Sequence, residues 1–245
     1  MICDWTIFAF PLNFLLALIW TCGWIWLWKK RRSCLVMRFM HSPKATLSSL
    51  LLMLGSCIWI GFTGNRDFTQ SIFFIIILLY IQTVLLLVIL RGWRTARGNI
   101  RWRFILLHAG LLLALGSGFW GAPDSSQMRV RLMSDQTTRE AYFIDGTRGV
   151  LSYELTLKEF EAEYSPNHKP VHYEAVITVD NKEPVKITVN HPYNVRAGEN
   201  IYLTEVSEYG CVFQIVREPW RVFALVGILM LIAGAFMLFI KGPRR

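Results

Sequence analysis

The sequence predicts a membrane-embedded α-helical bundle with one all-β domain inserted before its last helix. Three features carry this prediction: apolar runs long enough to cross a bilayer, basic segments that alternate with segments that are not basic, and one long stretch with the periodicity of strands. Of the 245 residues 53% are hydrophobic, and the mean hydropathy is +0.37. Because about 20 apolar residues span the ~30 Å hydrocarbon core, we expect five transmembrane helices, at residues 7–28, 45–62, 71–90, 104–121 and 222–240.

Basic residues predict the orientation of these helices. Lys29–Lys44, Arg91–Arg103 and the C-terminal tail contain more than half of the 26 Lys and Arg and no acidic residue. Since Lys and Arg concentrate in cytoplasmic loops, we expect the N-terminus outside and the C-terminus inside. The first helix precedes its positive charges, so it is an N-out anchor rather than a cleaved signal peptide. The net charge of +9 then reflects topology, and no nucleic-acid partner is expected.

The first apolar run ends in four tryptophans, Trp20, Trp24, Trp26 and Trp28. Tryptophan is enriched where a transmembrane helix meets the membrane surface. We therefore interpret this cluster as an aromatic belt at the inner end of the first helix.

The pattern of residues 122–221 predicts a β domain, which we expect on the extracytoplasmic side. Apolar and polar residues alternate in the segment from His172 to Asn190, which indicates a hairpin around Asp180, Asn181 and Lys182. Eight short strands in this stretch favour a sandwich or a partly open barrel. They include Met128–Met133, Glu140–Ile144, Leu151–Leu157, Glu159–Tyr164, Asn200–Val206 and Cys211–Arg217 beside the hairpin. The chain thus divides into four helices in residues 1–121, the β domain in 122–221, and the last helix with its basic tail in 222–245.

His108 is the main candidate functional residue. It lies within the fourth apolar run, Phe104–Gly121, which contains no acidic partner. A polar group in hydrocarbon is costly unless it is paired. Two roles remain open: a hydrogen bond that joins His108 to a neighbouring helix, or ligation of a metal or cofactor, since neutral imidazole is a strong axial ligand for iron.

Other catalytic or metal-binding patterns are weak. The five cysteines form no CxxC or CxxCH motif, so covalent attachment of c-type haem to this chain is excluded. His168, His172 and His191 lie in the β domain, but no thiol or carboxylate has a recognisable ligand spacing with them, which argues against a zinc site. An ion transporter is disfavoured because His108 is the single ionisable side chain deep in a predicted span.

Several motifs occur in an order that resembles a known family. These are FILLHAGLLLALGSG in the fourth span, GVLSYELTLKEFEAEY, KPVHYEAVITV and VKITVNHPYNVRAGENIYL in the β domain, and REPW before the last span. Together they are similar to the ResB-like (CcsB) cytochrome c biogenesis proteins of the system II pathway. The resemblance covers roughly Ser71–Lys241, while the outer domain is shorter than is usual in that family.

The resemblance implies a function. The chain would be a subunit of the system II assembly complex in the bacterial inner membrane, a non-catalytic or accessory part of a holocytochrome c synthase. It would bind non-covalent haem b and pass it to a CcsA-like (ResC) partner for attachment to CxxCH sites of apocytochrome c. By motif, His108 matches a transmembrane axial haem ligand of that family.

Two arginines precede His108 on the basic side of its helix. Arg101 and Arg103 are candidates to bind the haem propionates, since arginine binds carboxylates in a bidentate manner; the alternative is that both are only topology signals. The competing function is a membrane-anchored scaffold with an outer β domain and no haem, in which His108 holds helices together.

Overall fold

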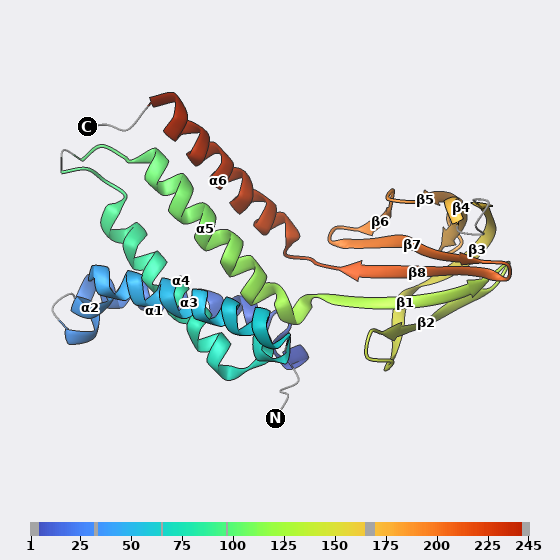
Figure 1. The fold of residues 1–245 in the computed structure, drawn as a ribbon, viewed down its shortest axis with the longest axis horizontal. Helices are drawn as coiled ribbons and strands as arrows, with labels where there is room; N and C mark the ends of the chain where they lie inside the picture. Colours follow the sequence, from blue (N-terminus) through green and yellow to red (C-terminus); the bar gives the residue numbers. More distant parts are fainter. Residues whose placement is uncertain (1–4, 32–33, 65, 97, 165–169, 242–245) are drawn as a thin grey trace. The chain divides into compact units, whose positions relative to one another are not determined.

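The computed structural model describes residues 5–31, 34–64, 66–96, 98–164 and 170–241. Its contacts divide the chain into two compact units. The helical unit comprises residues 1–123 and 220–245, and the β unit comprises residues 124–219 (Figure 1).

Five helices of the helical unit are long and apolar enough to cross a membrane. They are α1 (Leu12–Lys30), α3 (Pro43–Thr63), α4 (Ile72–Gly92), α5 (Trp102–Gly121) and α6 (Arg221–Lys241). Each predicted span therefore corresponds to one helix. The first begins at Leu12 instead of residue 7, because Trp5–Phe8 forms a 3-10 turn and Pro11, which lacks an amide hydrogen, stands directly before the helix.

Serine caps begin two of these helices. The Ser42 hydroxyl accepts a hydrogen bond from the Ala45 amide, and that of Ser71 from the Phe74 amide, at the starts of α3 and α4. At its other end, α3 stops at Gly64, whose positive φ of 63° suits a residue without a side chain.

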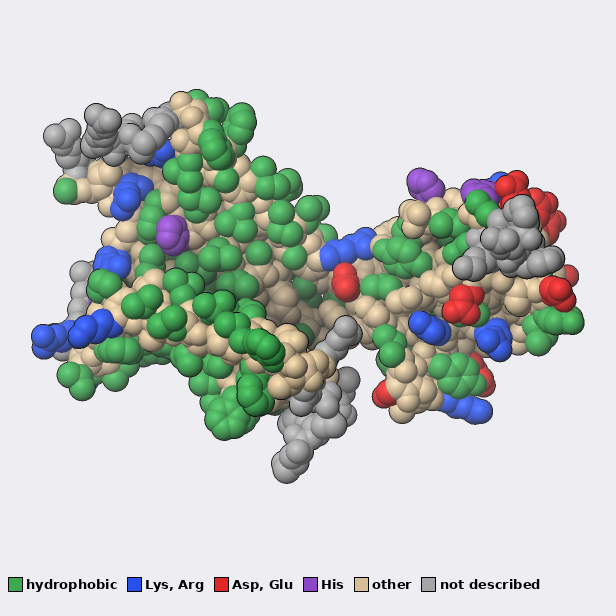
Figure 2. Space-filling model, in the orientation of Figure 1, with side chains coloured by type: hydrophobic (Ala, Val, Ile, Leu, Met, Phe, Trp, Pro, Cys, Tyr) green, Lys and Arg blue, Asp and Glu red, His purple; other side chains and the backbone are tan. Residues whose placement is uncertain are grey.

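A short helix, α2 (Leu35–Met40), occupies the segment that the sequence suggested as a basic loop. Met37 and Met40 are buried in a small core with Ala45, Val84 and Leu87. Arg91 donates a hydrogen bond to the His41 carbonyl, so the segment is tied to the end of α4. Lys and Arg gather at one end of the helical unit (Figure 2).

Helices α5 and α6 form an antiparallel pair in close backbone contact. A Cβ added at Gly110 would lie 2.8 Å from the Gly227 carbonyl oxygen, and one added at Gly227 would lie 2.7 Å from the Ala114 nitrogen. Small residues that let backbones approach are typical of helix packing in membranes.

The β unit is one antiparallel sheet of eight strands in the order β5-β4-β3-β2-β1-β8-β7-β6. The strands are β1 (Ser126–Met133), β2 (Thr137–Phe143), β3 (Arg148–Tyr164), β4 (Pro170–Val179), β5 (Val185–Thr188), β6 (Tyr193–Arg196), β7 (Glu199–Ser207) and β8 (Gly210–Arg217). The sheet curls so that Tyr173 of β4 donates a hydrogen bond to the Thr204 carbonyl of β7, 3.3 Å away. This single curled sheet corresponds to the partly open barrel, not to the two-sheet sandwich.

The sheet encloses one apolar core. Its largest fully buried side chains include Phe213, Leu132, Leu155, Ile177 and Ile187. The predicted hairpin is present, with Ala175 opposite Ile187 and Ile177 opposite Val185. Val189 of the same pattern is half-buried and lies beyond the end of β5.

Two strand predictions were wrong. Leu151–Leu157 and Glu159–Tyr164 are one strand, β3, whose register shifts between Leu157 and Glu159. The bulge at Lys158 reverses the alternation, so one strand has the pattern of two. The sequence analysis also missed β6, which has four residues and pairs on one side with β7.

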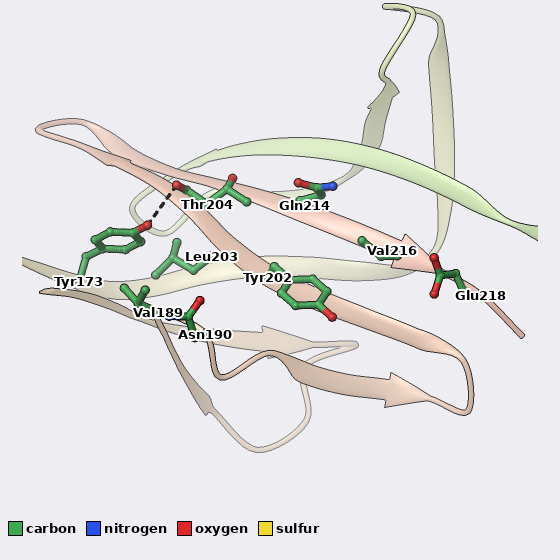
Figure 3. Close-up of a pocket in the computed structure, with 9 residues that line it drawn as sticks. All are labelled: Tyr173, Val189, Asn190, Tyr202, Leu203, Thr204, Gln214, Val216 and Glu218. Carbon is green, nitrogen blue, oxygen red and sulfur yellow. Dashed lines mark hydrogen bonds between the residues drawn. The ribbon is translucent and has the colours of Figure 1, made fainter. Parts of the chain in front are cut away.

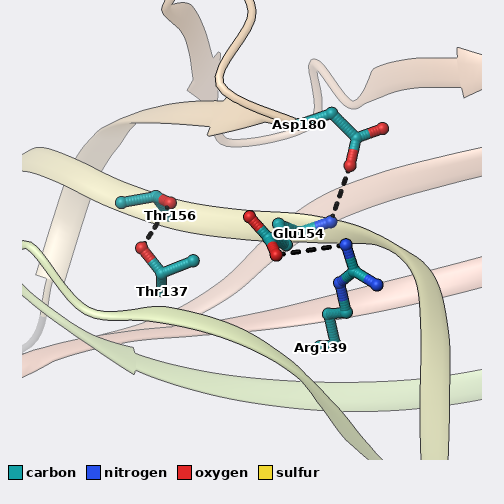
Figure 4. Close-up of polar contacts among 5 residues, drawn as sticks. All are labelled: Thr137, Arg139, Glu154, Thr156 and Asp180. Atoms are coloured by element: carbon teal, nitrogen blue, oxygen red, sulfur yellow. Dashed lines mark hydrogen bonds and ion pairs between the residues drawn. The ribbon is translucent and has the colours of Figure 1, made fainter.

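Polar contacts cross the sheet between β2, β3 and the turn after β4 (Figure 4). The Thr137 and Thr156 hydroxyls are 2.8 Å apart, and Arg139 lies 3.1 Å from the Glu154 carboxylate. Asp180 accepts a hydrogen bond from the Glu154 amide at 2.9 Å. These contacts fix the register where β3 is flanked by β2 and β4.

Another ion pair of the β unit, Arg196–Glu199, has a buried carboxylate. Glu199 is buried and contacts Arg196 through two guanidinium nitrogens, at 2.8 and 2.6 Å. Burial, together with the Glu199 carboxylate, raises the pKa of Tyr153 far above its usual range. The Tyr153 hydroxyl therefore stays protonated at any physiological pH.

Candidate functional site

His108 is held by its own helix. Its Nδ1 lies 2.8 Å from the Phe104 carbonyl oxygen, one turn earlier on α5, and the two rings stack with centroids 4.0 Å apart. A carbonyl only accepts hydrogen bonds, so Nδ1 must carry the proton. In neutral imidazole the lone pair is then on Nε2.

Nε2 is the ring nitrogen that can bind something else. His108 is half-buried, and among the described residues the only hydrogen bond of its side chain is the one from Nδ1. Proteins usually orient a ligating histidine through a hydrogen bond that its other ring nitrogen donates to a carbonyl or a carboxylate. The arrangement therefore fits an axial ligand for iron.

The Nε2 nitrogen does not serve the α5–α6 contact. Successive helical residues are rotated by about 100°, so His108 lies nearly opposite Gly110, which faces α6. The hydrogen bond to a neighbouring helix that the sequence left open is not formed by His108 within the part of the chain that the structure describes.

Arg101 lies on the same side of α5 as His108. Its guanidinium carbon is 4.8 Å from the centroid of the Phe104 ring, and one of its nitrogens is 3.3 Å from the Gly92 carbonyl. Phe104 thus contacts both the guanidinium and the imidazole. The Phe104 ring therefore separates the exposed guanidinium of Arg101 from the candidate ligand, His108.

Arg103 is placed differently from Arg101. It is five residues from His108, which on a helix corresponds to a rotation of about 140°. The structure therefore brings Arg101 and His108 to one side of α5, and Arg103 to another. The α6 backbone lies directly against Gly110, while Gly118 faces open space.

A buried polar cluster, which was not predicted from the sequence, lies farther along α5. Gln82 of α4 accepts a hydrogen bond from the Trp120 indole at 3.0 Å, and Asn13 of α1 donates one to the Trp120 carbonyl at 2.7 Å. The Gln82 amide nitrogen is buried without a hydrogen-bond partner among the described residues. The signal was present in the sequence, because Gln82 is the single amide in a strongly apolar run.

The β unit carries a groove of about 470 Å³ beside β7 and β8 (Figure 3). Its lining combines two tyrosines, two amides and a carboxylate with apolar side chains: Tyr173, Val189, Asn190, Tyr202, Leu203, Thr204, Gln214, Val216 and Glu218. Such a lining offers hydrogen bonds and aromatic contacts, and none of its residues is a histidine or a cysteine.

The histidines of the β unit do not form a metal site among the described residues, where no group of three metal-binding side chains occurs. His172 lies 3.9 Å from the Glu174 carboxylate, and His191 is exposed in the turn after β5. His168 lies outside the described residues. Cys211 is buried, and burial raises the pKa of its thiol to about 12, so it is unreactive.

Comparisons with known proteins find a family for the segment that contains His108 and most of the β unit. Residues 97–212 match the model of the ResB-like family, which confirms the resemblance inferred from the motifs. A solved structure of "Cytochrome c Heme Lyase CcmF" is similar with 12% sequence identity and a TM-score of 0.41. The match covers 95% of this chain and 46% of that one, so the chain spans about half its length. No curated protein matches the chain.

Proposed function

We propose that this ResB-like chain is a membrane subunit of cytochrome c assembly, with His108 as an axial ligand of non-covalent haem b in transit. The observation that carries the proposal is the orientation of the imidazole. Nδ1 donates a hydrogen bond to the Phe104 carbonyl, so the lone pair of Nε2 is available to a ligand. His108 also lies inside the matched segment, residues 97–212.

The residues present suit haem. Arg101 supplies a cation for a propionate, and the Phe104 ring beside His108 supplies an apolar, aromatic surface. Arg103 is a weaker candidate for a propionate because it lies on another side of α5. Bound haem would carry the iron chemistry, while this chain would bind and orient it and would not itself cleave or form the thioether bonds.

The rest of the proposal concerns partners and location. A CcsA-like protein would receive the haem, and apocytochrome c would accept it in the outer compartment. The chain would lie in the bacterial inner membrane with the β unit on the extracytoplasmic side. The clustering of Lys and Arg at one end of the helical unit supports this orientation.

Replacing His108 by Ala tests the ligand role. We expect the complex purified with its CcsA-like partner to lose haem absorbance and c-type cytochrome maturation, while the subunits still copurify. Added imidazole should restore part of the function, since it can occupy the vacated axial position. His191→Ala, an exposed histidine in the same matched segment, is the control and should behave as wild type.

A different pattern would support the scaffold alternative. If the H108A complex dissociates and imidazole does not help, His108 holds helices together. If haem content and cytochrome c maturation stay normal, His108 is not the ligand.

Reporter fusions test the orientation. Fusions at Gly64 and in the β unit should be active in the outer compartment, and fusions at Gly98 and the C-terminus in the cytoplasm. A cytoplasmic signal from the β unit would contradict the proposed delivery of haem to an outer acceptor.

A further inference from the structure

Exposed apolar side chains lie on the hairpin of β2 and β3, on both sides of its turn. Ile144 and Val150 are 70% and 79% exposed, and Tyr142 and Phe143 are 42% and 37% exposed. The hairpin is itself well formed: the Asp145 carboxylate accepts hydrogen bonds from the amide and hydroxyl of Thr147, and Gly146 has a positive φ of 85°. The exposure is thus a property of an ordered turn.

The register places this turn at one particular end of the sheet. Strand β1 begins at Ser126, which pairs with Arg217 at the end of β8. Phe143 pairs with Met128, two residues from the start of β1. At about 3.3 Å per residue, the turn from Ile144 to Thr147 reaches the level of Ser126.

That end of the sheet is covalently joined to the membrane-spanning helices on both sides. The apolar span that contains α5 runs to Asp124, two residues before β1, and α6 begins at Arg221, four residues after β8. Whatever its tilt, the β unit therefore keeps Ser126 and Arg217 close to the membrane surface. The β2–β3 turn is attached to the same end.

The opposite end of the sheet has a different composition. The β1–β2 turn contains Ser134, Asp135 and Gln136, and the β7–β8 turn contains Glu208 and Tyr209. Exposed apolar side chains thus gather in the β2–β3 hairpin at the tethered end, while the two turns at the far end are mainly polar or acidic. Exceptions at the far end are Tyr209, 76% exposed, and Met133, 58% exposed.

We propose that the tip of the β2–β3 hairpin contacts lipid, with Tyr142 and Ile144 in the interfacial layer of the leaflet next to Asp124. Aromatic and aliphatic side chains are favourable at that depth. Arg148, which pairs with Tyr142 across the hairpin, has a long side chain that reaches lipid phosphates. The hydrogen bonds from Thr147 hold the pKa of Asp145 below its usual value, so this carboxylate stays charged at the turn and in the headgroup layer.

The contact is independent of haem. It would give the β unit a third attachment to the membrane besides its two chain connections, and so would fix the direction in which the groove and β5 face. The contact does not depend on His108 or on a partner protein.

The test uses the full chain in lipid nanodiscs without haem or partner, with its five cysteines replaced. Single cysteines at Tyr142, at Ile144 and, as the matched control, at Tyr209 carry an environment-sensitive fluorophore. Lipids with a nitroxide near the headgroup should quench the labels at 142 and 144 at least about twofold more than the label at 209, because interfacial side chains lie within several Å of the headgroups.

Equal quenching at all three positions, strong or weak, would overturn the proposal. Two labelled positions on the hairpin guard against one substitution that disturbs the turn, and an unchanged circular dichroism spectrum shows that the sheet is intact. Because no haem is present, loss of haem binding by H108A and failure of this quenching test are separate results.

Discussion

The two units differ in where their large apolar side chains lie: the β unit buries them, and the helical unit exposes many of them. In the β unit Phe213 and Ile187 are fully buried, whereas in the helical unit Phe62 and Phe239 are 90% and 86% exposed. The β unit is therefore stabilised by removing apolar surface from water. The helices of the helical unit are surrounded by lipid instead of water. Their association with one another therefore depends on close packing and on a few internal hydrogen bonds. The same type of substitution should consequently have different effects in the two units.

The largest effect is expected when phenylalanine is truncated in each unit. Phe213→Ala removes a fully buried ring and should cost about 3–5 kcal/mol of unfolding free energy in the β unit. Phe236→Ala in α6, 64% exposed, should change stability by less than about 0.5 kcal/mol, because lipid replaces the lost contacts.

Cys211 provides the measurement for the β unit. It is the single cysteine of that unit and is buried with a raised pKa, so it reacts when the sheet opens. In Phe213→Ala its labelling in native buffer should accelerate by about a hundredfold or more. Titration with SDS measures Phe236→Ala, and an equal loss of stability in both variants would contradict the distinction between the units.

A smaller effect is expected from overpacking the helix pair. Gly110→Leu would place its side chain against the α6 backbone, which should cost about 1–3 kcal/mol. Gly118→Leu, on the same helix but with nothing near its Cβ, is the control. Loss of near-ultraviolet circular dichroism during titration with SDS reports the stability. If both variants unfold alike, the glycine contact does not hold α5 and α6 together.

The smallest effect concerns the polar surface of the sheet. Arg139→Ala removes the ion pair with Glu154, in which both side chains are substantially exposed (Figure 4). We expect a loss of about 0.2–1 kcal/mol at low salt and less at high salt. A loss as large as that of Phe213→Ala would mean that the sheet depends on its polar contacts more than on its core.

The same contrast explains which elements could be predicted from the sequence. A membrane span needs only length and apolarity, so the five helices were located to within a few residues. Helix α2 was missed because its burial depends on Val84 and Leu87, which are distant in the sequence. Strand β3 was divided in two because the bulge at Lys158 exists only through pairing with β4.

For the candidate site, residue type was predictable and geometry was not. The sequence identified His108 as an exceptional polar residue in an apolar run. It did not reveal that Nδ1 donates to the Phe104 carbonyl, or that the Arg101 guanidinium packs on the Phe104 ring. Both depend on rotation about the helix axis and on side-chain conformation, which residue spacing limits but does not determine.

The pairing of Ser126 with Arg217 has a consequence for how this chain can be cut and rejoined. The β unit starts and ends on neighbouring strands, and α5 and α6 already form an antiparallel hairpin through Gly110 and Gly227. Residues 124–219 therefore form an insertion at the tip of a helical hairpin. We expect that a few glycines in their place would reconnect the two helices, so that the β unit could be gained, lost or exchanged while α5 and α6 stay paired.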